Sequence, residues 1–392
     1  MSSVHTWPAT AVVTSCEYPN GLAAIRSLGR RGIDVVAVDD DRRAVGMNSR
    51  YARPVLAPSP MKDTGGLIAS LLELGDGFDR PAVLFATSDP VLRAVAEHSE
   101  VLGDRYVYPF PSSWETLGPT QDKWVQVRKS EEAGIPVPRT AAEPTTELGF
   151  PVVVKPDSPF PFRLRYPGVH AYLCSDLEET EAAFARCADY HPLVQEFIPG
   201  GDDVLYTFGT YVAEDGEALG LFSGRKLRQT PPLVGSCRVA EAVWVDEVVE
   251  HGLALVHALG YHGICQVEFK LDRRDGLFKM IEVNTRPWGW HGLTGACGVD
   301  LVRLAYDDLT GTRPEPRRMN NEGKRWAITL LGSTLPAPQW PPYVDAIFVK
   351  DDLRPAVADI RHQARMGRRR LANGFRLIRR AATRRRRGSP AR

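Results

Sequence analysis

The sequence predicts a mixed α/β fold divided into two or three domains. Strand and helix patterns alternate in the first part of the chain, which is typical of a parallel sheet covered by helices. Farther along, several strands follow one another and include a tight hairpin, which indicates an antiparallel sheet. The chain has 392 residues, long enough for several domains and a sizeable core. Its apolar fraction of 43% and charged fraction of 25% are ordinary for a soluble globular protein.

The N-terminal stretch reads as an α/β unit in which strands and helices alternate. The expected elements are strands over residues 11–14, 35–39 and 82–87 and helices over residues 21–32 and 91–98. Such a unit forms a parallel sheet, and ligands bind at the carboxyl ends of its strands. Asn20 and Gly21 are not a full dinucleotide fingerprint, so a ribose contact from Asp39 in that kind of site is not our preferred reading.

The middle of the chain places two lysines at the ends of expected elements. A helix opens within residues 118–124 and closes near Gly134, which puts Lys123 near its start. An apolar run over residues 151–156 reads as a buried strand that ends at Lys155. The next expected elements are a helix over residues 177–188, a strand and turn over residues 193–200, strands over residues 207–212 and 219–225, and a helix over residues 245–259.

A hairpin follows, formed by two runs that alternate apolar and polar residues at period two. The runs cover residues 266–271 and 278–284, and a turn-forming cluster lies between them. Pairing the runs about position 275 sets Glu268 opposite Glu282, and Asn284 shares the face of Glu282. Because directly opposed carboxylates repel each other, a hard cation is the simplest reason to keep them together. The plain alternative is a solvated hairpin face.

These features resemble the ATP-grasp superfamily of carboxylate–amine ligases. The resemblance is carried by the order of Lys123, Lys155 and the acidic hairpin, with the run Gln-Glu-Phe-Ile at residues 195–198 between them. It extends from about residue 10 to residue 310, is closest to the predicted-carboligase branch, and is more distant from D-alanine–D-alanine ligase and D-aspartate ligase. It implies an ATP-grasp fold with a Rossmann-like N-terminal domain.

The resemblance also implies a division of the chain into five parts. These parts are an N-terminal α/β domain (residues 1–112), a small ATP-grasp subdomain (113–192), a large subdomain with the metal hairpin (193–315), a C-terminal extension (316–359) and an Arg-rich amphipathic tail (360–392).

The resemblance assigns nucleotide contacts to several residues. Lys123 and Lys155 would meet the phosphates of ATP, where a compact ammonium charge is useful; the alternative for each is a solvated surface lysine. The expected interdomain hinge, which would contact adenine through its backbone and apolar side chains, consists of Glu196, Phe197 and Ile198. Gln195, directly before it, is also an expected nucleotide contact. Asp203, or with less support Asp202, would hold the ribose hydroxyls, and either could equally be a turn residue.

The resemblance assigns Glu268, Glu282 and Asn284 to magnesium. Two Mg²⁺ ions, for which Mn²⁺ can substitute, would bridge the phosphates and neutralise the charge that develops in phosphoryl transfer. Mg²⁺ is usually coordinated by one or two carboxylates together with phosphate and water oxygens, and the spacing of the hairpin residues fits this coordination.

Arg286 follows the metal strand directly and is one of two expected catalytic residues. The family places an arginine here against the acyl phosphate or the substrate carboxylate, and a guanidinium suits that bidentate contact. The alternative is a surface ion pair. The nearby Trp288, Trp290 and His291 either wall the acceptor pocket or pack in the core.

Further cations are expected around the terminal phosphate. Arg225, which we prefer to its neighbour Lys226, is the second expected catalytic residue, with a plain ion pair as the alternative. Residues 157–168 stand where the family usually has a small glycine-rich loop whose amides cover the phosphates. Three prolines and three aromatic residues make this segment stiff and bulky. Arg163 and Arg165 would supply charge in place of the amides, or would select an anionic acyl substrate.

The C-terminal tail is strongly basic and the rest of the chain is acidic. From Arg361 onward there are 13 Arg and no Asp or Glu, whereas the whole chain has a net charge of +1. Apolar or small residues recur every three to four positions at Ile360, Ala364, Gly367, Leu371, Phe375 and Ile378. The pattern is typical of a basic amphipathic helix on an anionic membrane surface, here over residues 360–387. A nucleic acid partner, a solubilising tail and docking onto the acidic body are the alternatives, and no module for sequence-specific base reading is seen.

The sequence therefore indicates an ADP-forming ligase in which a carboxylate is activated as an acyl phosphate and captured by an amine, an amino acid by family resemblance. The alternatives are a non-catalytic nucleotide-binding module and an ATP-grasp kinase. Six scattered cysteines suit reduced thiols, and neither a transmembrane run nor a secretory leader is visible. We expect a cytoplasmic protein, peripheral to the membrane if the tail binds lipid. The oligomeric state is open, although many members of the superfamily are homodimers.

Overall fold

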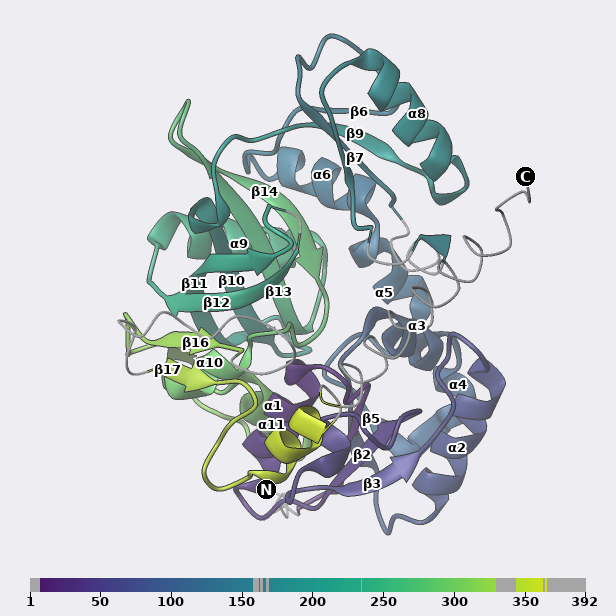
Figure 1. Ribbon diagram of the computed structural model, residues 1–392. Coiled ribbons are helices and arrows are strands. Elements are labelled where there is room, and N and C mark those ends of the chain that lie inside the picture. The colour runs from purple at the N-terminus through teal and green to yellow at the C-terminus, as the bar shows by residue number, and fades with distance from the viewer. Residues whose placement is uncertain are drawn as a thin grey trace, which may run out of the picture.

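The computed structural model describes residues 8–157, 162, 165–166, 169–233, 235–328, 343–361 and 364. Within these residues the strands form three sheets, each in a separate part of the molecule (Figure 1). The N-terminal sheet lies at one end, the small middle sheet lies at the other, and the large sheet lies to one side between them.

The N-terminal domain is a five-stranded parallel sheet with the order β3-β2-β1-β4-β5. Its strands are β1 (Ala11–Thr14), β2 (Val35–Asp39), β3 (Arg53–Leu56), β4 (Ala82–Ala86) and β5 (Tyr106–Val107), and its helices are α1 (Pro19–Gly29), α2 (Thr64–Asp76), α3 (Asp89–Glu97) and α4 (Ser99–Leu102). The three central strands are buried along their whole length, as expected for strands covered on both faces. The strand order reverses between β1 and β4, and ligands of open α/β sheets bind at such a point.

Two helices lead from this domain into the small subdomain. They are α5 (Trp114–Gln121) and α6 (Lys123–Glu132), and Asp122 caps α6 by accepting a hydrogen bond from the backbone of Val125. Lys123 is thus the first residue of a helix, as the sequence predicted.

The small subdomain is an antiparallel sheet with the order β6-β9-β7-β8. Its elements are β6 (Thr140–Ala141), β7 (Val152–Lys155), β8 (Tyr172–Cys174), α8 (Leu177–Cys187) and β9 (Leu193–Glu196). The expected boundary after residue 192 needs correction, because β9 pairs with β6 and β7 and the chain leaves this sheet only after Glu196.

The large subdomain is an eight-stranded sheet in which β14-β13-β10-β11-β12-β16-β17 are neighbours and β15 pairs with β11. Its strands are β10 (Leu205–Val212), β11 (Ala218–Thr230), β12 (Ser236–Ala242), β13 (Gly263–Asp272), β14 (Leu277–Asn284), β15 (Arg317–Arg318), β16 (Arg325–Ala327) and β17 (Tyr343–Asp345), and its helices are α9 (Asp246–Ala258), α10 (Gly292–Ala296) and α11 (Leu301–Leu309). Helix α9 packs closely on β10, where a Cβ on Gly252 would lie 2.3 Å from the Phe208 ring. The expected C-terminal extension supplies β15, β16 and β17, so it continues the large sheet rather than forming a separate unit.

The remaining described secondary structure is a helical stretch over residues 354–361 and several short 3₁₀ turns. The turns are η1 (Gly46–Asn48), η2 (Gly103–Arg105), η3 (Ala188–Tyr190) and η4 (Asp202–Val204).

The N-terminal domain and the large subdomain share their buried cores, whereas the small subdomain has its own. One cluster joins Ile25 of α1 to Phe222 of β11 and Trp290, and a second joins Leu84 of β4 to Phe208 of β10. A third cluster contains only residues between 148 and 194 and is centred on β7, β8, β9 and α8. The first two parts therefore form one packed body, and the small subdomain stands apart from it (Figure 1).

Candidate functional site

The hairpin of β13 and β14 has the strand pairing that the sequence predicted. Glu268 lies opposite Glu282, and Gln266 lies opposite Asn284. The register shifts directly after Glu268, because Phe269 pairs with Met280 and leaves one extra residue on β14. Such a bulge bends a strand and re-aims its side chains. The predicted opposition of the two glutamates is confirmed, and the bulge beside them was not foreseen.

Two lysines neutralise the opposed glutamates. The Nζ atom of Lys226 lies 2.8 Å from Oε2 of Glu268, and Nζ of Lys123 lies 3.3 Å from Oε1 of Glu282. Burial would lower the pKa of Lys226, but the charge and hydrogen bond of Glu268, together with Cys237 and the charge of Glu282, outweigh burial, and the pKa is raised from its ordinary value. Lys226 therefore stays a cation in an almost fully buried position.

Arg225 and Lys226 contact different partners, since successive side chains of a strand point to opposite faces. Arg225 donates two hydrogen bonds to Oε2 of Glu241, at 3.1 and 2.8 Å, and Arg325 contacts the other oxygen of that carboxylate. Lys226 contacts Glu268 of the metal hairpin. The structure thus brings Lys226, and not the preferred Arg225, to the hairpin glutamates.

Lys155 lies at the end of β7, as the sequence predicted, and donates a hydrogen bond of 2.8 Å to Oε1 of Gln195 on β9. Burial lowers the pKa of Lys155 to about 8, and the charges of Glu282 and Lys123 act on it in opposite directions. These two groups are therefore near enough to influence it electrostatically. The ammonium lacks a carboxylate at ion-pair distance among the described residues, which leaves its charge available to an anion.

Asn284 presents its amide oxygen on the side where Arg286 lies. Its Nδ2 donates to Oε1 of Gln266 at 3.3 Å, and its Oδ1 accepts from a guanidinium nitrogen of Arg286 at 3.4 Å. Together with Glu268 and Glu282 it gives two carboxylates and one amide oxygen, which suits Mg²⁺ when phosphates supply further oxygens. No group of three His, Cys, Asp or Glu within the described ranges is arranged to hold a metal by itself.

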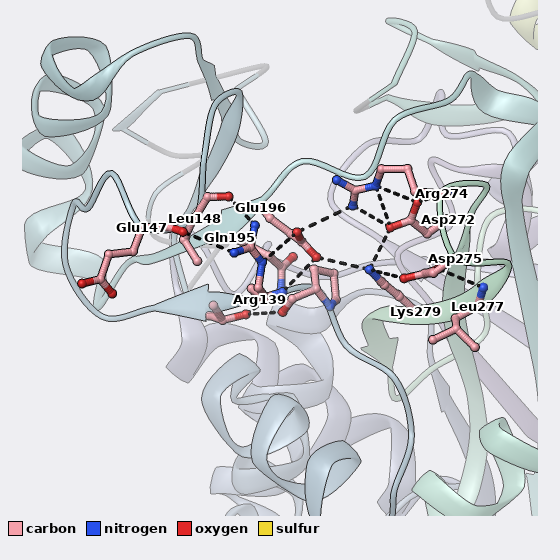
Figure 2. A network of polar contacts seen from close by, with 12 residues as sticks. Arg139, Glu147, Leu148, Gln195, Glu196, Asp272, Arg274, Asp275, Leu277 and Lys279 are labelled. Carbon is pink, nitrogen blue, oxygen red and sulfur yellow. Dashed lines mark hydrogen bonds and ion pairs between the residues drawn. The ribbon is translucent and has the colours of Figure 1, made fainter.

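Glu196, at the end of β9, belongs to a network of ion pairs that joins the small subdomain to the hairpin (Figure 2). Its carboxylate accepts a hydrogen bond from Nε of Arg139 at 3.1 Å and lies 3.3 Å from Nζ of Lys279. Asp272 in turn contacts Lys279 at 2.7 Å and forms a forked pair with Arg274. Burial would raise the pKa of Glu196, but the hydrogen bonds from Arg139 and the charge of Lys279 lower it overall.

The other expected nucleotide contacts lie around this network. Ile198 is buried, and the ammonium of Lys270 lies 4.6 Å from the centre of the Phe197 ring. The carboxylate of Asp202 accepts hydrogen bonds from the backbone and the side chain of Gln229, and so it stabilises the local loop. Asp203 is exposed and contacts Arg273 at 3.1 Å. Arg163 lies outside the described residues.

Arg286 forms a forked ion pair with Asp89, a residue that the sequence analysis did not select. The guanidinium donates to the two carboxylate oxygens of Asp89 at 2.5 and 3.0 Å. Asp89 is the first residue of α3, directly after β4, and therefore lies at the carboxyl edge of the N-terminal sheet. Its position after a strand of that sheet was the only local signal that could have identified it.

The same edge carries other polar groups. Ser15 after β1 has a φ of 54°, a strained value for a residue with a side chain, and its hydroxyl lies 2.6 Å from that of Ser88. Asn20 donates to the backbone oxygens of Thr87 and Pro287, so it ties this edge to the segment after β14.

Trp288, Trp290 and His291 lie in the core. Each is at most 3% exposed, and the two indole rings meet edge to face with their centres 5.9 Å apart. His291 Nε2 lies 3.0 Å from the backbone oxygen of Asn20, and burial lowers the pKa of His291. The structure favours the packing alternative for these three residues.

A small antiparallel sheet and a large one, with lysines from both and an acidic hairpin on the large one, are the arrangement of an ATP-grasp fold. A family profile described as the ATP binding domain of the carbamoyl-phosphate synthase L chain matches residues 241–307, which include the hairpin of β13 and β14 and Arg286. The chain is 24% identical to D-aspartate ligase of Enterococcus faecium (strain Aus0004) over 253 residues, and the match spans 59% of each chain.

Solved structures show the same fold. Biotin carboxylase from Campylobacter jejuni aligns with a TM-score of 0.61 and 16% identity, covering 77% of this chain and 71% of that one. The L-amino acid ligase from Bacillus licheniformis aligns with a TM-score of 0.58 and 19% identity, covering 78% of this chain and 75% of that one. The chain therefore has the ATP-grasp fold.

Proposed function

We propose that the chain is an ATP- and Mg²⁺-dependent ligase that joins a carboxylate to an amine and releases ADP and phosphate. The observation that carries this proposal is the charge arrangement at β13 and β14, where two opposed glutamates are balanced by Lys123 and Lys226 beside Asn284. The similarity to a protein named D-aspartate ligase supports the reaction class.

The lysines would bind the phosphates of ATP. Lys123 comes from α6, Lys155 from the small sheet and Lys226 from the large sheet, so a triphosphate between them would contact all three parts. Lys155 has a lowered pKa because it is enclosed with other cations nearby, and an anion beside it would restore its charge. We therefore assign phosphate binding to these three residues.

Magnesium fits the donor set of Glu268, Glu282 and Asn284. The amide nitrogen of Asn284 donates to Gln266, so its amide oxygen is the atom that would bind a cation, and it would exchange its long contact with Arg286 for that cation. When bound, Mg²⁺ would neutralise the phosphate charge that develops in the transfer step. Lys123 and Lys226 would then be able to exchange their glutamate partners for phosphate oxygens.

Arg286 would position the acyl group. In the first step a carboxylate oxygen attacks the terminal phosphorus of ATP, the bond to the bridging oxygen breaks, and ADP leaves. In the second step an amine attacks the acyl carbon, the bond to phosphate breaks, and the amine loses a proton. A guanidinium that binds two oxygens at once suits the carboxylate and the acyl phosphate that replaces it.

Asp89 would orient Arg286 and face the substrate amine. Its forked contact holds the guanidinium between the carboxyl edge of the N-terminal sheet and the metal hairpin. An amino acid carries a carboxylate and an ammonium group, and the pair of Arg286 and Asp89 is complementary to both charges. The names of D-aspartate ligase and of the L-amino acid ligase agree with an amino acid substrate.

The test is ADP release from ATP and Mg²⁺ with pooled carboxylates and amino acids. We expect ADP formation that requires a carboxylate and an amine together, and that is lost in Glu282→Ala. Glu250→Ala, an exposed change on α9, is the matched control and should turn over normally. Mass analysis of the product would show the new amide bond.

Other outcomes would identify the alternatives. ADP formation that needs no amine, with a phosphorylated product, would identify a kinase. ATP binding without turnover across the whole panel would favour a nucleotide-binding module. Normal turnover in Glu282→Ala would show that the hairpin is not the metal site.

A further inference from the structure

The segment before the basic tail exposes its large apolar side chains and buries its small ones. Leu353, Val357 and Ile360 are 45%, 43% and 52% exposed, whereas Ala356 and Asp359 are 1% and 2% exposed. Residues 354–361 are helical. A surface helix normally turns its large apolar side chains toward the core. We call Leu353, Val357 and Ile360 the apolar row.

The apolar row is not a frayed end, because its base is fixed to the N-terminal domain. Asp352 is fully buried and pairs with Arg26 of α1 at 3.0 Å, and it also accepts hydrogen bonds from Ser49 and from the backbone of Arg50. Arg26 donates further hydrogen bonds to backbone oxygens of residues 346, 347 and 352. The segment that carries the apolar row is therefore held in a fixed position on the N-terminal domain.

The charges beside the apolar row are mainly positive. Arg354 and Arg361 are exposed beside it, and the acidic residue of the helix, Asp359, is buried. The exposed Asp351 just before the row is paired with Arg30. In the sequence the spacing of the row continues with Ala364, Leu371 and Ile378, among 13 arginines and no acidic residue. Apolar residues on one side with arginines between them are what binds the interface of an anionic bilayer.

We propose that the apolar row, with Arg354 and Arg361 beside it, forms a docking surface for an anionic lipid membrane. A second copy of the chain fits less well, because three half-exposed side chains give far less than the roughly 800 Å² per partner of a stable dimer. A nucleic acid would use the arginines but would leave the apolar row in water. No helix in the described ranges is long and apolar enough to cross a bilayer.

The position of the row is compatible with catalysis on a membrane. In Figure 1 the chain runs from β17, beside β16 of the large sheet, to the yellow helix beside the N-terminal domain, and the small subdomain lies at the opposite end of the molecule. Docking through the apolar row would therefore leave the small subdomain free to move over the nucleotide. The proposal does not depend on the identity of the ligated substrates.

The test is flotation of the full chain with vesicles of phosphatidylcholine alone or mixed with phosphatidylglycerol. We expect binding to the mixed vesicles that weakens with salt. In Val357→Ser/Ile360→Ser the affinity should fall about tenfold, since two half-exposed apolar side chains no longer enter the bilayer. Val101→Ser/Leu173→Ser changes equally exposed residues elsewhere and should bind as wild type. Thermal unfolding checks that both variants fold.

A direct contact readout separates lipid from the other occupants. An environment-sensitive dye on Ile360→Cys should shift to the blue with mixed vesicles, and the same dye on Leu173→Cys should not. Equal vesicle binding by wild type and Val357→Ser/Ile360→Ser would overturn the proposal, because the arginines would then act alone. The absence of vesicle binding would also overturn the proposal. Binding of a homopolymer RNA would then point to a nucleic acid, and a dimer lost in Val357→Ser/Ile360→Ser would point to a second copy of the chain.

Discussion

Replacing Lys226 by methionine tests which cation of β11 serves the reaction. Methionine keeps most of the side-chain volume but removes the ammonium that lies 2.8 Å from Glu268. Lys226 is 7% exposed, so the lost charge is not replaced by water. A group that stabilises charge in a dry site typically contributes about 10²–10³ in rate. We therefore expect kcat to fall by about two to three orders of magnitude.

The assay is steady-state ADP release once an active substrate pool is known, with Arg225→Met as the matched control. Arg225 is one residue away and pairs with Glu241, which keeps a second partner in Arg325, so we expect the loss of Arg225 to change kcat less than about threefold. Nucleotide binding by titration calorimetry and the thermal midpoint would show that both variants fold. A larger loss in Arg225→Met than in Lys226→Met would refute the assignment of faces on β11.

Three further predictions follow from the charges described above. Asp89→Asn should raise KM for the carboxylate about tenfold, the usual cost of one charge-assisted hydrogen bond, with little change in KM for ATP; equal effects on both would contradict its position. Because the pKa of Lys155 is near 8 in the free protein, ATP association should weaken as pH rises above 8, and Lys155→Met should flatten that profile; a profile unchanged by the substitution would exclude Lys155 as the titrating group. Arg26→Met leaves the carboxylate of Asp352 buried without its partner and should lower the free energy of unfolding by about 3–5 kcal/mol in urea titrations, whereas Arg43→Met, which breaks an exposed pair, should change it little.

The sequence was a good guide where local periodicity determines the structure. The opposition of Glu268 and Glu282 follows from two alternating runs around a short turn, and the structure has that pairing. The sequence also predicted Lys155 at a strand end and Lys123 at a helix start. Lys155 ends an apolar run, and Lys123 directly follows Asp122, which caps the helix.

Other features depend on contacts that no local pattern contains. Arg225 and Lys226 are adjacent cations, and only the pairing of β11 with its neighbours shows which one meets Glu268. The contact of Arg286 with Asp89 joins residues 197 positions apart. Trp288 could not be placed in the core until β10 and β11 were seen to pack against it.

The separate core of the small sheet has a consequence for hydrogen exchange. The buried apolar side chains of β7, β8, β9 and α8 pack among themselves, and Glu196 at the end of β9 forms an ion pair with Lys279 of the hairpin. Such a unit can unfold while the remainder stays native, at a cost below that of global unfolding. Amides of β7 should therefore exchange sooner than those of β10 or β13. A nucleotide bound to Lys155 would slow the exchange of these amides. The ratio of the exchange rates with and without nucleotide would then measure how tightly the nucleotide binds the folded small subdomain.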